Sequence, residues 1–213
     1  MRLLVAKLGG GLAGAPEREA WLDALALAPA CPGRGLVLVP GGGPFAEAVR
    51  RAQGPLGFDD ATAHSLALLA MHQYALVLRA AWPRLKPAAS RAEIFAALEA
   101  GRIPVWLPHA MASADPGVET SWDMTSDSLA AWLARSLGAH ELLLVKACAV
   151  PAGASLADLA ASGVVDPLFP RYAAKSGARV HVAGSADLAG AKARFSEAGT
   201  PGRLLARPAA RAA

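Results

Sequence analysis

The sequence predicts an α/β protein whose mostly parallel sheet is covered by helices on both faces. Apolar segments of strand length, such as RLLVAKL at 2–8 and GLVLVP at 35–40, alternate with longer segments of helical pattern. Three glycines follow each of these two strands, at 9–11 and 41–43. A chain with 54% hydrophobic and 18% charged residues can bury the core that such a sheet needs.

Helix start and stop signals place the remaining elements in order. Pro16 and acidic residues open the first helix, Asp59 and Asp60 begin the longest one, and Ser90 caps another that stops at Gly101. Strands are expected at 2–8, 35–40, 103–107, 141–147, 179–182 and 203–206. Helices are expected at 17–27, 44–53, 59–81, 91–100, 127–137, 156–161 and 185–198, with an ordered loop at 108–122 and a turn at 164–170.

The length of 213 residues favours one large domain. No internal repeat or linker divides the sequence, so we expect a single domain at 1–206. Residues 207–213 contain only proline, alanine and arginine, a composition that predicts a frayed C-terminal tail.

Charge and cysteine content exclude several classes of protein. The net charge of +4 comes without a cluster of basic residues, so a nucleic-acid partner is not expected. Residues 61–78 carry no charge but contain histidine, threonine and glutamine, which favours a buried helix over a membrane span. Lys7 interrupts the apolar segment that a signal peptide would need. Cys31 and Cys148 suggest neither a disulfide framework nor a zinc site, so a cytoplasmic protein is expected.

The two glycine triplets are candidate phosphate-binding loops. Backbone N–H groups between a strand and a helix N-terminus converge on anions. Loops after consecutive parallel strands lie at the carboxyl edge of the sheet, where ligands of open α/β folds bind. Neither triplet matches the Walker or the dinucleotide-binding pattern, and each also fits a plain tight turn.

Two lysines at the ends of apolar strands need an anion nearby. Burying Lys7 or Lys146 without a partner is costly unless the ammonium group reaches the edge of the sheet. Asp127, which begins a helix after Thr125 and Ser126, is the obvious partner, although it also fits an ordinary helix start. Two lysines, one carboxylate and two glycine loops together favour phosphoryl transfer.

Other constellations are weaker. His64 and His72 lie eight residues apart without a third ligand, so we interpret them as core or surface residues and expect no metal site. Serines near position 126 lack the G-x-S-x-G pattern of a hydrolase. The tryptophans are interpreted mainly as core residues, except Trp122, which lies beside the candidate site.

Several motifs in order resemble the amino acid kinase family. They are KLGG at 7–10, PGGGPFAEAVR at 40–50, TSDSLAAWLA at 125–134 and LLLVKA at 142–147. The resemblance spans nearly the whole chain and implies a three-layer αβα sandwich that transfers the γ-phosphoryl group of ATP. Within the family, AMHQYALVL at 70–78, WDMTSDSLAAWLA at 122–134 and VVDPLFP at 164–170 most resemble 5-(aminomethyl)-3-furanmethanol phosphate kinases, with uridylate kinases as the second likeness.

The resemblance also implies roles for individual residues. Lys7 and Lys146 would hold the transferring phosphoryl group, and Asp127 would orient the two lysines. Phosphates would bind to N–H groups of the glycine loops, at Gly9, Gly10, Gly41, Gly42 and Gly43. The substrate-binding residues would be Asp60, Trp122, Asp123, Thr125 and Ser126. ATP and Mg²⁺ are the implied cofactors, with Mg²⁺ held mainly by the nucleotide phosphates, and a homo-oligomer is implied.

The acceptor is expected to be a small phosphorylated molecule. A cationic aminomethyl group favours carboxylates, for which Asp59, Asp60, Glu119 and Asp123 are candidates, and the ring of Trp122 offers a cation–π contact. The acidic pair at the helix start also fits a simple cap. UMP remains the alternative acceptor, and a non-catalytic nucleotide-binding or storage subunit remains the alternative class.

Overall fold

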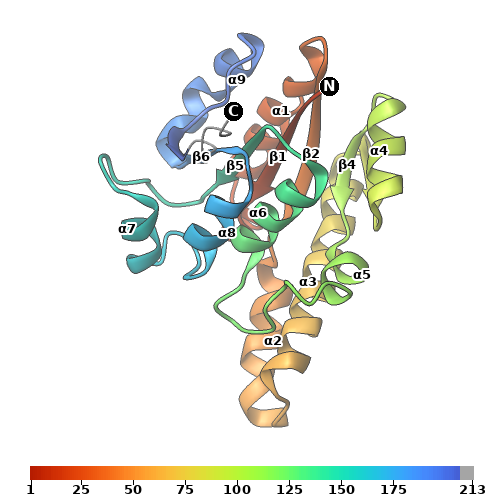
Figure 1. The fold of residues 1–213 in the computed structure, drawn as a ribbon, viewed down its shortest axis with the longest axis vertical. Coiled ribbons are helices and arrows are strands. Elements are labelled where there is room, and N and C mark those ends of the chain that lie inside the picture. The colour runs from red at the N-terminus through yellow and green to blue at the C-terminus, as the bar shows by residue number, and fades with distance from the viewer. Residues whose placement is uncertain (207–213) are drawn as a thin grey trace, which may run out of the picture.

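A computed structural model describes residues 1–206 and contains a seven-stranded sheet in the order β3-β4-β2-β1-β5-β6-β7 (Figure 1). All neighbouring strands are parallel except β6 and β7, which are antiparallel. This confirms the predicted α/β class. The strands are β1 (Arg2–Leu8), β2 (Arg34–Pro40), β3 (Leu85–Ala88), β4 (Ile103–Trp106), β5 (Glu141–Val145), β6 (Arg179–Ala183) and β7 (Arg203–Ala206).

Helices cover both faces of this sheet. They are α1 (Glu17–Leu25), α2 (Gly43–Leu56), α3 (Asp60–Ala81), α4 (Arg91–Glu99), α5 (Pro108–Ser113), α6 (Ser126–Leu137), α7 (Leu156–Ala161), α8 (Phe169–Lys175) and α9 (Leu188–Ser196). Short 3-10 turns lie at Gly10–Leu12, Ala28–Ala30 and Ser185–Asp187.

Alternation along β1 divides the core between the two faces. Leu3 and Val5 pack with residues of α6 and α8, whereas Leu4, Ala6 and Leu8 pack with residues of α1 and α9. Figure 1 shows α6 and α8 on the near side of the sheet and α1 behind it. Because side chains alternate with a period of two, Lys7 shares the α6 face with Leu3 and Val5.

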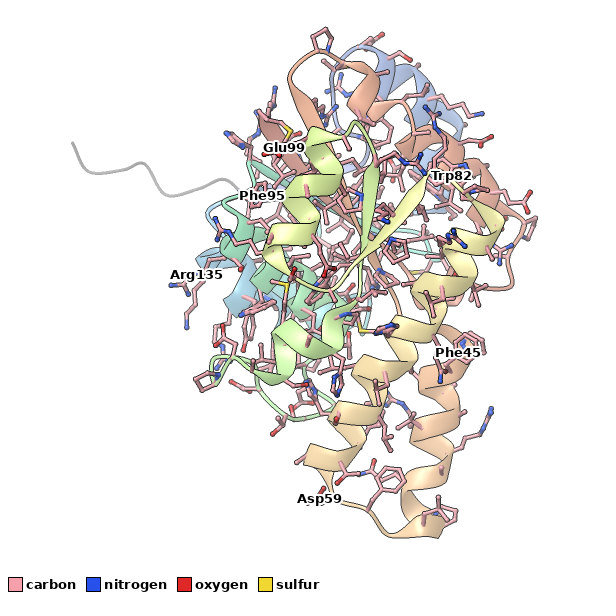
Figure 2. The ribbon with its side chains drawn as sticks, turned by 90° about the vertical axis from the view of Figure 1, so that its right-hand side faces the viewer. Phe45, Asp59, Trp82, Phe95, Glu99 and Arg135 are labelled. Atoms are coloured by element: carbon pink, nitrogen blue, oxygen red, sulfur yellow. The ribbon has the colours of Figure 1, made fainter. Side chains whose placement is uncertain are left out.

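Helices α2 and α3 form an antiparallel pair that projects beyond the carboxyl edge of the sheet (Figures 1 and 2). Asp59 lies at the tip of this pair in Figure 2, where its carboxylate accepts a hydrogen bond from Thr62 N at 2.8 Å. The helix start predicted at Asp59 is therefore an N-cap. Within residues 1–206, no helix is long and apolar enough to cross a membrane.

Three elements differ from the sequence prediction. Strand β3 was not predicted, because a four-residue edge strand that contains Lys86 and Pro87 has little strand character. Helix α5 occupies the first part of the expected loop at 108–122, and α8 begins within the expected turn at 164–170. Both helices are too short for a clear hydrophobic period. The predicted tail at 207–213 lies outside the described residues.

Candidate functional site

The loops after β1 and β2 touch each other at the carboxyl edge of the sheet. A Cβ atom added to Gly41 would lie 2.3 Å from the amide nitrogen of Gly10. One added to Gly10 would lie 2.7 Å from the amide nitrogen of Gly43, which itself has a positive φ of 54°. Glycine is therefore required here because two backbones meet without room for a side chain.

These glycines differ in what their N–H groups can bind. Gly9 N donates to Val145 O and Gly41 N donates to Leu8 O, each at 2.9 Å, which extends the sheet by one residue. This corrects the expectation that the N–H groups of Gly9 and Gly41 face a phosphate. Gly10 opens a 3-10 turn, and Gly42 and Gly43 lie at the start of α2, where the first N–H groups of a helix have no intrahelical partner. These three glycines are the phosphate-binding candidates.

Lys7, Asp127 and Lys146 come together as the sequence predicted. Asp127 Oδ1 lies 2.8 Å from Lys7 Nζ, and Asp127 Oδ2 lies 2.8 Å from Lys146 Nζ. Lys7 reaches Asp127 because both residues lie between the sheet and α6, and Lys146 directly follows β5. The Lys7 and Asp127 side chains are only 4% and 3% exposed. Two ammonium groups on one carboxylate leave a surplus positive charge.

The protonation of this trio follows from burial and mutual attraction. Burial alone would raise the pKa of Asp127, but the charges of Lys7 and Lys146 outweigh it and lower the pKa to about 2. Burial lowers the pKa of Lys7, and the nearby Asp127 offsets only part of this effect. The carboxylate is therefore ionised at neutral pH and acts as a fixed counter-charge for both lysines.

Asp166 is a residue of this site that sequence reasoning missed. It is buried, and its Oδ2 accepts hydrogen bonds from Thr125 N at 3.0 Å, Thr125 Oγ1 at 2.8 Å and Ser128 N at 3.0 Å. Its own backbone N donates to Asp127 Oδ2 at 3.3 Å. Asp166 thus caps α6 from a distant segment, whereas Thr125, at the N-cap position, makes no side-chain capping hydrogen bond. The segment VVDPLFP supported the family resemblance but had been given no role.

Two cavities meet beside the trio. One, of about 430 Å³, is lined by Lys7, Asp127, Lys146 and the segment around Asp166. The other, of about 610 Å³, lies between α2, α3 and the segment that precedes α6. Both are lined by Gly10, Gly11 and Thr125, so they are neighbours across the first glycine loop. Two molecules bound in the two cavities would face each other at that loop.

The predicted substrate residues divide between the larger cavity and its surroundings. Trp122, Thr125 and Ser126 line it, whereas Asp60 and Asp123 are not among its lining residues in the described part of the chain. Asp60 Oδ1 accepts from Gln53 Nε2 at 2.8 Å, and Gln53 Oε1 accepts from Trp122 Nε1 at 2.6 Å.

The other acidic candidates for a cationic ligand, among the residues described, do not line the larger cavity. Asp59 caps α3, Glu119 pairs with Arg171, and Asp123 is exposed. The ring of Trp122, expected to contact a ligand cation, is already covered by the Arg50 guanidinium at 4.3 Å from its centroid.

Sequence reasoning did not identify three polar residues that line the larger cavity, namely Glu47, Arg50 and His64. The two charged residues looked like the solvent face of an ordinary amphipathic helix, and His64 was interpreted as a core or surface histidine. Only the packing of α2 against α3 brings the three to one cavity. The polar wall of this cavity is therefore built from helices that follow the glycine loops.

The fold and this arrangement define an α/β protein with two lysines and two carboxylates gathered in one of two neighbouring cavities at the carboxyl edge of its sheet. The sequence profile of the amino acid kinase family matches residues 2–149, and the chain belongs to that family. A [5-(aminomethyl)furan-3-yl]methyl phosphate kinase of Methanocaldococcus jannaschii is 28% identical over 109 residues, which is 51% of this chain and 50% of that enzyme. The match thus spans about half the length of that relative.

Solved structures share the fold. Uridylate kinase from Archaeoglobus fulgidus aligns with a TM-score of 0.64 at 17% identity, covering 95% of this chain and 98% of that one. UMP kinase from Bacillus anthracis aligns with a TM-score of 0.66 at 16% identity, covering 94% and 93% of the two chains. Aspartate kinase from Synechocystis aligns with a TM-score of 0.66 at 18% identity and covers 99% of this chain but 40% of that one. These likenesses confirm the three-layer αβα fold.

Proposed function

We propose that this protein transfers the γ-phosphoryl group of ATP to the phosphate of a small acceptor, in the first place [5-(aminomethyl)furan-3-yl]methyl phosphate. The products would be ADP and the acceptor diphosphate. The observation that carries the proposal is the trio of Lys7, Asp127 and Lys146 in the smaller cavity, which shares Gly10, Gly11 and Thr125 with the larger one. The matching family and the partial match to a furan phosphate kinase support the choice of reaction and acceptor.

The residues of the site fit the charge of an ATP phosphate chain. The trio carries a net charge of +1. Gly10 lies between the two cavities and Gly42 and Gly43 line the larger one, so N–H groups are available to the phosphates of both substrates. An acceptor phosphate oxygen would attack the γ-phosphorus while the bond to the bridging β–γ oxygen breaks and ADP leaves. Lys7 and Lys146 would neutralise the charge on the transferring group, which is where electrostatic stabilisation has its largest effect.

Asp127 is assigned a positioning role rather than that of a base. A phosphate acceptor is already ionised at neutral pH, so its oxygen is a nucleophile without loss of a proton. With a pKa of about 2, Asp127 is also a poor proton acceptor. Its role would be to hold two ammonium groups at one place.

Mg²⁺ would enter with the nucleotide and supply charge neutralisation on its phosphates. Within residues 1–206, no group of three or more His, Cys, Asp or Glu side chains is arranged to hold a metal ion. In this proposal the metal would be held chiefly by phosphate oxygens.

The decisive experiment gives purified protein ATP, Mg²⁺ and one acceptor at a time, with products identified by mass spectrometry and phosphorus NMR. We expect the diphosphate of the aminomethylfuran compound. Efficient UDP formation from UMP without any furan diphosphate would replace the acceptor, while ATP binding without transfer to either would favour a nucleotide-binding subunit. Lys146→Ala, made in parallel, separates transfer at this site from a contaminating kinase.

A further inference from the structure

His64 presents an unpartnered nitrogen to the larger cavity. It lies in the second turn of α3, is only 7% exposed and lines the cavity. Its Nε2 atom is buried and has no hydrogen-bond partner among the described residues. A buried polar atom without a partner is uncommon in folded proteins, and one at a cavity wall is placed to meet a ligand.

The bonding of the ring indicates which role Nε2 can take. Burial lowers the pKa of His64, so the ring is neutral at physiological pH. A neutral imidazole carries its proton on one ring nitrogen and offers a lone pair on the other. With the proton on Nδ1, the buried and unpartnered Nε2 is an acceptor at the cavity wall.

The position of His64 along α3 places its Nε2 atom far from the end of the larger cavity where the glycines lie. Tyr74 lies beside the second glycine loop, since its ring is 3.7 Å from the position of a Cβ on Gly43. His64 precedes Tyr74 by ten residues, which is about 15 Å along a helix. Between these two ends the wall is apolar, with Leu68 and Met71 from the same helix. Both acceptors named above are shorter than this rise, so an acceptor that reaches His64 has its phosphate part-way along the cavity, which Thr125 and Ser126 also line, and not beside Tyr74.

We propose that His64 determines substrate specificity by accepting, through Nε2, a hydrogen bond from an N–H donor at the end of the acceptor molecule opposite its phosphate. The inference rests on the proposed function and deepens it, because it names the substrate class: a phosphomonoester whose ring carries an N–H group at the far end. The ammonium group of an aminomethylfuran has this chemistry, and so has the N3–H group of a uracil.

The test compares matched substrates on matched variants. His64→Leu removes the acceptor nitrogen at similar volume, and His64→Gln restores an acceptor oxygen in nearly the same place. His72→Leu, on the same helix but not among the cavity residues, is the control. Each protein is assayed with the aminomethylfuran phosphate and its methyl analogue, and with UMP and N3-methyl-UMP.

We expect His64→Leu to raise KM for the amine-bearing acceptor about tenfold or more with kcat changed less than about twofold, because the lost contact is made equally in ground and transition states. KM for the methyl analogue should not change, the glutamine variant should recover part of the loss, and the His72 control should match wild type. If His64→Leu raises KM equally for an N–H-bearing substrate and its methyl analogue, or raises KM for neither, the inference is overturned.

Failure of the proposed acceptor is distinguishable from failure of this inference. If UMP is the acceptor, the same pattern is expected with UMP against N3-methyl-UMP. That result would support the role of His64 and reject the furan compound as the substrate. If no acceptor is phosphorylated, calorimetric binding of the four compounds in the presence of a non-hydrolysable ATP analogue decides. Identical binding to wild type and His64→Leu, or no binding at all, then overturns the inference.

Discussion

Two buried carboxylates, one at each end of the parallel strands, hold basic side chains for different purposes. Asp127 lies at the carboxyl edge with Lys7 and Lys146, beside the two cavities. Glu141 lies at the amino edge with Arg2, Arg34 and Arg179. Strand β1 contributes to both clusters through Arg2 and Lys7.

The two clusters differ in how completely the donors around each carboxylate are hydrogen-bonded within the protein. Glu141 Oε2 accepts from Arg34 Nη2 at 2.8 Å and from Thr200 Oγ1 at 2.9 Å, while Arg34 also donates to Thr200 and to Gly199 O. Together with Arg2 and Arg179, this network ties four strands, β1, β2, β5 and β6, to the segment before β7. Lysine, by contrast, is a point charge with three rotatable donors, so a lysine held by one carboxylate oxygen retains donors for another anion. Similar electrostatics therefore stabilise the fold at one edge and, in the proposed function, leave lysine donors for a phosphate at the other.

The largest expected effect on stability is at the amino edge. Glu141→Ala leaves a buried Arg34 without its counter-charge and should lower the free energy of unfolding by about 3–5 kcal/mol, measured by urea denaturation. Turnover by the fraction that remains folded should stay near wild type. Arg2→Ala is the control, because its half-exposed pair should contribute about 1 kcal/mol or less. Loss of turnover in folded Glu141→Ala would contradict the division between the two edges.

Lys146→Ala should show the opposite pattern. Removing a charge that acts on the transferring phosphoryl group should raise the barrier by about 3 kcal/mol, roughly a hundredfold in kcat, with little change in the unfolding midpoint. The exposed pair of Lys192 and Asp23 offers a control, and Lys192→Ala should leave kcat unchanged. Near-normal kcat in Lys146→Ala would remove this lysine from the mechanism.

Acid should weaken the carboxyl edge in a defined pH range. The pKa of Asp127 is lowered in the folded chain from 3.8 to about 2, so its stabilising contribution is complete above the ordinary value. It is lost as the pH falls from 3.8 toward 2, a change of about 2 kcal/mol. Urea denaturation of wild type and Asp127→Asn at several pH values from 5 to 2 should show the two stabilities converging by that amount. A constant difference would show that Asp127 is not the titrating group.

Asp166→Asn should have the smallest effect. The amide keeps one acceptor oxygen but loses the charge that holds Thr125 and Ser128, so the free energy of unfolding should fall by about 1–2 kcal/mol. Since the backbone of residue 166 also contacts Asp127, kcat should fall on the order of tenfold through misplacement of the trio. A variant with normal kcat and reduced stability would limit Asp166 to capping α6.

The sequence predicted the elements whose signals are local. Strand β1, the long helix α3 and the trio could be predicted because an apolar strand ending in lysine, an aspartate cap and a helix-start carboxylate are each visible over a few residues. Strand β3 could not be predicted, since a four-residue edge strand that contains Lys86 and Pro87 depends on tertiary neighbours, namely strand β4 and helices α3 and α4.

The parts of the site that escaped prediction depend on tertiary packing. Asp166 accepts a hydrogen bond from Ser128 of α6, although the two residues are 38 positions apart in the sequence. No local pattern indicates such a contact. His64 and His72 look alike in the sequence, yet only His64 lines the cavity among the residues described. Asp60 and Asp123 were predicted as substrate residues from the family resemblance and from their charge. Packing turns Asp60 toward Gln53 and leaves Asp123 exposed.

The shared boundary of the two cavities has a kinetic consequence. Gly10, Gly11 and Thr125 belong to both walls, so donor and acceptor would meet directly across one loop. Transfer then needs both molecules bound at once and no phosphorylated form of the protein. Such a mechanism is sequential, with initial-rate lines that intersect, and an analogue that spans both cavities would bind with the combined contacts of the two substrates.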